Sequence, residues 1–213
     1  MKILVIDTSG PVCGTAVMDE TKVYSEFTAQ NRLTHSASLM PMVEETLNAA
    51  GTALHDLDAV AAVTGPGSFT GMRLASALVK GWVFGYPEIQ VRCVPSALIA
   101  ADAATADRVA VLQDGRNQEM LVFGLKKQNG TYLPDGFTAV WNREQAAEQL
   151  PVQNYGEWVV SSADEAAVRK LLPETATDLQ ICRTYSAAPL LRAELPYDGD
   201  LDKLVYIRPA VFS

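Results

Sequence analysis

The sequence contains few cysteines and no long apolar run, and each shortage excludes classes of protein. Its 213 residues include three cysteines, Cys13, Cys93 and Cys182, and no C-x-x-C pair, which argues against a disulfide framework and a zinc ribbon. No stretch reaches the roughly 18 to 20 uninterrupted apolar residues of a membrane-spanning helix. The first apolar run is too short for a signal peptide and meets a carboxylate at Asp7. We therefore expect a cytoplasmic protein with no membrane partner.

Basic residues are also scarce. Lys and Arg number 17 and Asp and Glu number 25, so the formal net charge is −8. A protein that grips a phosphate backbone by itself needs clustered cations. We therefore expect any work on nucleic acid to pass through a basic partner. The apolar share of 48% and the charged share of 20% are those of an ordinary folded protein, with one large domain or two small ones.

The first half of the chain begins with strand signals and continues with helices. Short apolar runs predict a three-strand meander over 2–7, 13–18 and 22–28. Apolar residues three and four apart over 34–50 predict an amphipathic helix ended by Gly51. A strand, a helix and another strand are expected over 57–64, 69–84 and 90–94.

The helix expected over 69–84 is apolar around most of its circumference. Its large apolar residues are Phe69, Met72, Leu74, Leu78, Val79, Trp82, Val83 and Phe84. Such a helix lies either inside a large protein or under a covering surface. Because the chain is small and large apolar patches are rare on monomers, we favour a partner surface.

The second half has weaker signals. Strands are expected over 108–112, 119–126, 131–140, 158–160 and 179–182. Helices are expected over 143–150, 163–172 and 186–195, before a tail over 204–212. A hinge over 102–107 would separate two domains, 1–103 and 104–213. Two halves that each begin with strands and then alternate helix and strand predict a duplicated α/β protein. This plan resembles the actin-like ATPase, ribonuclease H-like fold, here with a reduced second subdomain; the analogy is one of fold class and says nothing of function.

Two turns carry residues that could meet phosphate and magnesium in such a fold. Asp7, Thr8 and Ser9 follow the first strand, where a carboxylate would serve the cation and backbone N–H groups the phosphate. Glycines Gly65 and Gly67 with Ser68 precede the apolar helix, whose N-terminus lets phosphate approach. Both turns also make sense without a ligand, the first as a local turn and the second as a helix cap. The chain has no Walker pattern and no Gly-Gly pair, which counts against ATP binding by this chain alone.

Metal and hydrolase signals are weak. A metal site on one helix face would use H-x-x-x-H, but His35 is followed four residues later by Leu39, so we expect no metal site. His55 stands beside Asp56 and has no evident role. The G-x-S-x-G elbow and the H-E-x-x-H motif are both missing.

Several segments together resemble the TsaB family, also called YeaZ. They are ILVIDTS at 3–9, HSASLMP at 35–41, TGPGSFTGMR at 64–73, DGRNQE at 114–119 and YIRP at 206–209. The resemblance spans the whole chain and is most specific in the first half. The second half is short and departs more from the family.

The resemblance implies a role in forming N6-threonylcarbamoyladenosine (t6A) at position 37 of tRNAs that read ANN codons. It implies a non-catalytic subunit without a cofactor, whose actin-like paralogue TsaD binds the metal and transfers the threonylcarbamoyl group. The ATPase TsaE would bind the TsaB–TsaD pair, and this chain would contact tRNA only indirectly. TsaD carries H-x-x-x-H on its metal helix, and the pair His35 and Leu39 is the departure expected of a degenerate paralogue.

The resemblance also implies a docking surface on the two helices of the first half. The same surface would pair two copies as a homodimer in the absence of TsaD. The side chains expected there are Leu39, Met42, Val43, Met72, Leu74, Ala75, Leu78 and Val79. The two turns, with Asp7, Thr8, Ser9, Gly65, Gly67 and Ser68, would then be vestigial nucleotide loops.

Two other functions stay open at this point. An actin-like kinase for a sugar or an acid would bind ATP and magnesium without a partner. A peptidase, an older description of this wider family, would depend on one serine or on His35.

Overall fold

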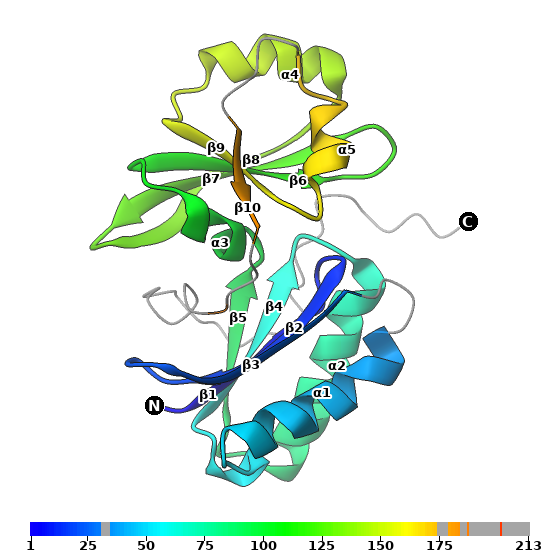
Figure 1. Cartoon of the computed structure of the whole chain (residues 1–213), viewed down its shortest axis with the longest axis vertical. Coiled ribbons are helices and arrows are strands. Elements are labelled where there is room, and N and C mark those ends of the chain that lie inside the picture. Colours follow the sequence, from blue (N-terminus) through cyan, green and yellow to red (C-terminus); the bar gives the residue numbers. More distant parts are fainter. Residues whose placement is uncertain (31–34, 174–178, 184–186, 188–200, 202–213) are drawn as a thin grey trace. The chain divides into compact units, whose positions relative to one another are not determined.

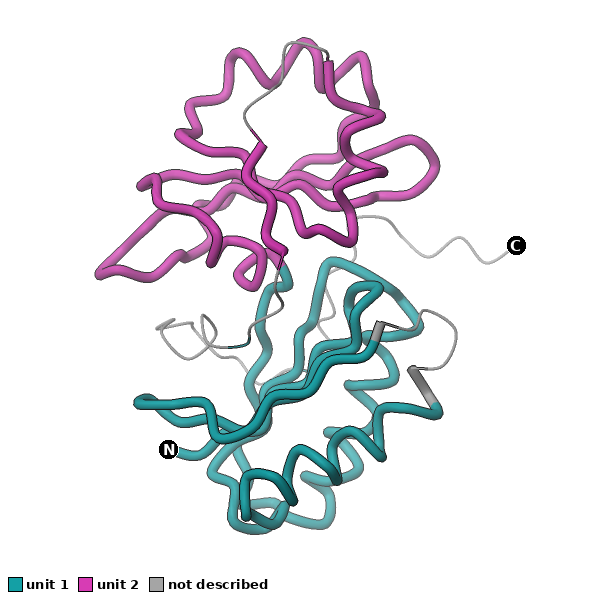
Figure 2. Tube along the Cα trace, in the orientation of Figure 1, with its two compact units in different colours: residues 1–96, 185–213 teal, residues 97–184 magenta. Residues whose placement is uncertain are grey.

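The computed structural model describes residues 1–30, 35–173, 179–183, 187 and 201 (Figure 1). They form two compact units, coloured separately in Figure 2. The first unit contains residues 1–96 together with Ala187 and Leu201, and the second contains the described residues from 97 to 183. The division thus falls between Ser96 and Ala97, whereas the sequence predicted it between 103 and 104.

The first unit is built on a five-stranded sheet in the order β3-β2-β1-β4-β5. Its strands are β1 (Ile3–Asp7), β2 (Val12–Met18), β3 (Val23–Gln30), β4 (Ala59–Gly65) and β5 (Gln90–Pro95). The first three strands are the predicted antiparallel meander, and β4 and β5 continue parallel to β1. Every residue of β1 and β4 is buried, as expected for central strands covered on both faces.

Two helices of the first unit pack against one face of this sheet (Figure 1). They are α1 (His35–Ala49) and α2 (Phe69–Gly85), both close to the predicted bounds. Helix α1 is terminated by the turn at Gly51, whose φ is +60°. The N–H groups of Gly51 and Thr52 bond back to the carbonyls of Asn48 and Leu47. A short 3-10 helix, Leu54–Asp56, then leads to β4.

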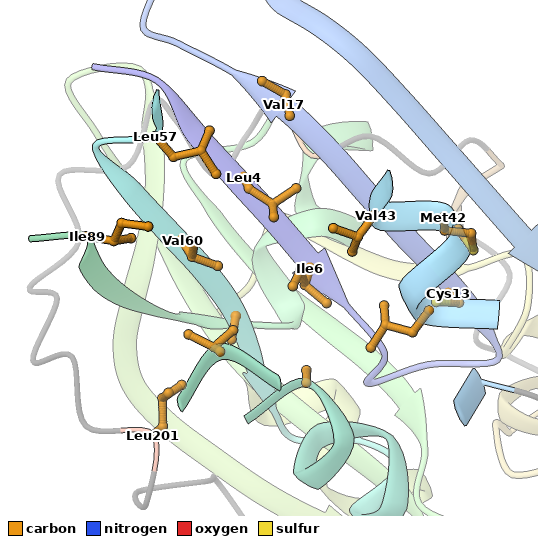
Figure 3. Close-up of a cluster of buried hydrophobic side chains, with 14 residues drawn as sticks. Leu4, Ile6, Cys13, Val17, Met42, Val43, Leu57, Val60, Ile89 and Leu201 are labelled. Carbon is orange, nitrogen blue, oxygen red and sulfur yellow. The ribbon is translucent and has the colours of Figure 1, made fainter. Parts of the chain in front are cut away.

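The core of the first unit lies between this sheet face and the two helices (Figure 3). Leu4 and Ile6 of β1 pack with Val43 of α1 and Val79 of α2. Leu201, far away in the sequence, joins the same cluster and is 5% exposed. Its carbonyl accepts a hydrogen bond of 3.1 Å from the Ser76 hydroxyl of α2.

The second unit repeats this plan. Its strands are β6 (Arg108–Asp114), β7 (Met120–Gln128), β8 (Thr131–Trp141), β9 (Glu157–Ser161) and β10 (Leu179–Cys182). Their order, β10-β9-β6-β7-β8, again places an antiparallel three-strand meander beside two parallel strands. Helices α4 (Arg143–Gln149) and α5 (Glu165–Arg169) pack their buried residues Ala146 and Val168 against it.

The duplicated α/β fold predicted from the sequence is therefore confirmed. Helix α5 is shorter than the predicted 163–172, and β4 begins at Ala59, after Leu57. Helix α3 (Ala97–Ala100) and a 3-10 turn, Ala101–Ala103, were not predicted, because such short elements show no periodicity. Apart from Ala187, the predicted helix over 186–195 lies outside the described residues, and so does the tail over 204–212. No helix in the described part of the chain combines the length and apolar character needed to cross a membrane.

Candidate functional site

The two predicted loops lie directly against each other. The turn after β1 and the turn before α2 are joined by two hydrogen bonds of 2.6 Å. The Ser68 N–H donates to the Ser9 carbonyl, and the Thr8 hydroxyl donates to the Gly71 carbonyl. Ser68 caps α2 as predicted, since its hydroxyl accepts from the Gly71 N–H at 3.2 Å.

Two glycines are required by this contact between loops. A Cβ atom on Gly67 would overlap the Ser9 carbonyl, and a Cβ atom on Gly71 would overlap the Thr8 carbonyl. Gly65 has a φ of +100°, a conformation that favours glycine. The glycine-rich motif therefore has a structural explanation in the approach of two protein segments, without reference to a phosphate.

Asp7 is the acidic group of this site and is 6% exposed. Its Oδ1 accepts hydrogen bonds from the Ser9 N–H at 2.8 Å and from the Ser9 hydroxyl at 2.6 Å. Burial raises the pKa of Asp7 above its usual range, and the two bonds from Ser9 oppose that shift only in part. Burial, with a smaller contribution from Asp7, also raises the pKa of Cys13 to about 11, so this thiol is a poor nucleophile.

No group of three or more His, Cys, Asp or Glu residues that could hold a metal ion occurs among the described residues. His35 is the first residue of α1, and Leu39, one turn later, is 1% exposed and part of the core. The second position of the H-x-x-x-H pattern is thus occupied by a packing residue.

The side chains predicted at the docking surface divide into two groups. Six of them are at most 8% exposed and belong to the fully buried part of the first unit: Leu39, Met42, Val43, Met72, Ala75 and Val79. The other two, Leu74 and Leu78, are half-buried at the border of the core. The set expected from the family resemblance thus combines six core side chains with two at the border of the core.

The outer face of α2 carries residues that the predicted interface omitted. Phe84 is 94% exposed, and Ala77 and Gly81 are also exposed. No atom lies within 4 Å of a Cβ built on Gly81 or Gly85, so the helix backbone is accessible there. Together with Leu74 and Leu78, these residues form what we call the α2 outer face: Leu74, Ala77, Leu78, Gly81, Phe84 and Gly85. Their spacing of three and four could have revealed this stripe in the sequence.

The 114–119 motif forms the loop between β6 and β7 in the second unit. Arg116, Asn117 and Gln118 all have positive φ, between 51° and 61°, and all are exposed. The Arg116 N–H donates to Asp114 at 2.9 Å, and the Gly115 N–H donates to the Glu119 carbonyl at 2.9 Å. Three successive non-glycine residues in this region are uncommon, and these hydrogen bonds help to hold them.

The paired sheets match solved structures of the actin-like ATPase fold. Component A of (R)-2-hydroxyglutaryl-CoA dehydratase from Acidaminococcus fermentans superposes with a TM-score of 0.52 and 11% identity, over 90% of this chain and 95% of that one. The ethanolamine utilization protein EutJ from Carboxydothermus hydrogenoformans gives 0.50 and 11%, over 90% and 88%. The chain is an α/β protein with the actin-like fold.

Closer relatives specify the family. A family model described as TsaD, tRNA N6-adenosine threonylcarbamoyltransferase, matches residues 23–184. The tRNA threonylcarbamoyladenosine biosynthesis protein TsaB of Escherichia coli K12 is 32% identical over 164 residues, 75% of this chain and 70% of that protein. The structure of YeaZ from Pseudomonas aeruginosa has a TM-score of 0.74 and 28% identity, over 89% and 88% of the two chains. The chain belongs to the TsaB (YeaZ) family.

Proposed function

We propose that this protein is a non-catalytic subunit in the formation of t6A at position 37 of tRNAs that read ANN codons. In this role it docks on TsaD, stabilises the productive shape of TsaD, and together with TsaD binds the ATPase TsaE in the cytoplasm. The name of the Escherichia coli relative supports the pathway, and the match to the TsaD family model supports kinship with the proposed partner.

The observation that carries the docking role is the α2 outer face. Phe84 is an almost fully exposed aromatic side chain, and such residues commonly anchor protein interfaces. Gly81 and Gly85 lie beside it and leave room for close approach of another helix. The docking surface proposed here therefore uses Leu74, Ala77, Leu78, Gly81 and Phe84, while the six buried side chains of the earlier prediction hold α1 and α2 on the sheet.

Two observations support a non-catalytic role. The glycines of the α2 loop are packed against the carbonyls of Thr8 and Ser9, and this contact fills the space into which a Cβ would project. Leu39 lies in the core, where its apolar side chain contributes to folding. Both features suit a paralogue that keeps the fold as a scaffold.

The variant Gly81→Leu tests the docking role. Because no atom lies within 4 Å of a Cβ at this position, the new side chain points into open space, and leucine has a higher helix propensity than glycine by up to about 1 kcal/mol. We expect a fold at least as stable as wild type, loss of TsaD on co-purification, and loss of t6A in tRNA when the variant replaces the wild-type protein in cells. Nucleoside mass spectrometry measures the last point.

A matched control is Ala147→Leu, which places the same side chain on the exposed face of α4 in the second unit. It should bind TsaD and support t6A formation as the wild type does. Two results together would overturn the proposal. One is a normal t6A level in cells that carry Gly81→Leu, and the other is no complex between the wild-type protein and TsaD in size-exclusion chromatography.

A further inference from the structure

A shallow, open cavity of about 420 Å³ lies at the C-terminal end of α1. It is lined by Glu44, Leu47, Asn48, Gly51, Thr52 and Ala53. Its size falls within the range of small-ligand sites. It belongs to the first unit and lies on one of the two helices that share a sheet face, so it neighbours the element that carries the proposed docking surface.

On the α1 side of this cavity the charges are negative. The C-terminal end of a helix carries about half a negative charge from its aligned peptide dipoles. Helix α1 has no basic residue in its last turn to balance that charge. Glu44 adds a full carboxylate, exposed and without an ion pair among the described residues.

One cation already lies at the opposite rim. The Lys2 ammonium donates a hydrogen bond of 3.1 Å to the Thr52 hydroxyl and lies 5.3 Å from the centre of the Tyr24 ring. Thr52 is thus occupied, whereas the Glu44 and Asn48 side lacks such a partner in the described part of the chain. The cavity therefore offers a second position to a positively charged group.

We propose that this cavity receives a guanidinium or ammonium side chain of the protein that docks on the first unit. The inference rests on the proposed docking function and names the chemistry of one contact in it. Glu44 pairs with the cation, the Asn48 carboxamide oxygen accepts a hydrogen bond from it, and the stem of the side chain packs on Leu47 and Ala53. The last carbonyl groups of α1 add a favourable field.

The test compares Glu44→Gln with Glu45→Gln. Both residues are exposed neighbours on α1, but only Glu44 lines the cavity. Binding of each full-length variant to purified TsaD is measured by calorimetry at low and at high salt. We expect Glu44→Gln to weaken binding about three- to fivefold at low salt and less at high salt, and Glu45→Gln to stay within about 1.5-fold of wild type. Thermal unfolding of both variants should match that of wild type.

The possible outcomes separate the two proposals. If wild type binds TsaD and the two variants behave alike, the cavity proposal is wrong while the docking function stands. If wild type does not bind TsaD, the docking function itself fails. If Glu44→Gln weakens self-association in sedimentation experiments but not TsaD binding, the cation belongs to a second copy of this chain, and the assignment to the docked partner is overturned.

Discussion

Gly67 and Gly71 illustrate how single residues determine the contact between the two loops. Each has its Cα so close to a backbone carbonyl of the β1 turn that any side chain would force the loops apart. Gly10, in the same turn, has its nearest atom, the Val12 nitrogen, 3.9 Å from a Cβ position. The three glycines therefore differ in whether a side chain can replace the hydrogen, and the sequence alone does not show this difference.

We expect Gly67→Ala to lower the free energy of unfolding by about 2 kcal/mol or more, because the clash is with backbone and cannot be relieved by rotating a side chain. Gly10→Ala is the matched control and should change stability by less than about 0.5 kcal/mol. Urea denaturation followed by circular dichroism measures both. If the two substitutions changed stability equally, the contact between the loops would not be the reason for a glycine at position 67.

The buried carboxyl group of Asp7 leads to a prediction about how the stability of the fold depends on pH. Its pKa in the folded protein lies above the unfolded value of 3.8, so the folded state holds this proton more tightly, and ionisation of Asp7 destabilises the fold as pH rises through that range. Asp7→Asn keeps an oxygen acceptor for Ser9 and removes the buried charge. The variant should be more stable than wild type at neutral pH, and the difference should shrink as pH falls through the folded pKa and reach its minimum below 3.8. A stability difference independent of pH would refute this account.

At the scale of elements, α1 is attached to the sheet by a small buried polar network. The hydroxyls of Thr15 on β2 and Thr46 on α1 lie 2.6 Å apart, and the Ser25 hydroxyl of β3 donates to the Thr46 carbonyl at 2.7 Å. Thr15 and Thr46 are fully buried. The network fixes the helix against two strands in a way that apolar contact alone would not.

The variant Thr46→Val should lose about 1–3 kcal/mol of stability, because it leaves the buried Thr15 hydroxyl without its partner. The double variant Thr15→Val with Thr46→Val should recover much of that loss, since both polar groups are then replaced by methyl groups of similar shape. A double-mutant cycle of unfolding free energies checks this. Simple additivity of the two single effects would argue against coupling between the pair.

Most elements of the first unit could be predicted from local pattern, but their orientation could not. Apolar residues three and four apart predicted α1 and α2, and Gly51 and Ser68 marked an end and a beginning. Which side of α2 faces the sheet depends on packing: Met72 and Val79 point inward, while Phe84 points outward. Six of the eight side chains expected at the docking surface from the family resemblance are core residues, whereas Phe84, Ala77 and Gly81 are exposed on α2.

At the scale of the whole molecule, the first unit is assembled from two separate parts of the chain. Leu201 completes a core whose other buried members lie between Leu4 and Ile89. Ala187 is fully buried, and its N–H donates to the Glu26 carboxylate of β3 at 2.8 Å. The residues between Ser96 and Ala187 include the whole second unit, so that unit is an insertion into the first.

We expect Leu201→Ala to lower the free energy of unfolding by about 2–5 kcal/mol, the usual effect of removing a buried leucine side chain. Val152→Ala is the control, because Val152 is 70% exposed in the second unit and should be nearly neutral. Chemical denaturation measures both variants. A neutral Leu201→Ala would mean that this residue does not belong to the core of the first unit.

The sequence predicted two like halves, and the matching sheet orders confirm them, since each half carries its own meander and its own parallel pair. The return of the chain to the first unit could not be foreseen. Leu201 is one apolar residue in a polar stretch, and its position depends on the core of the first unit and on the hydrogen bond from Ser76, which no local pattern encodes.

This discontinuity has a consequence for biosynthesis. A ribosome makes the meander, α1 and α2 early, but the leucine that closes their core emerges only after the entire second unit has been translated. Until then, the α2 side of this core lacks Leu201, and the Ser76 hydroxyl lacks the carbonyl to which it donates. The first unit is therefore the first to be synthesised, but its core is complete only after translation has passed Leu201.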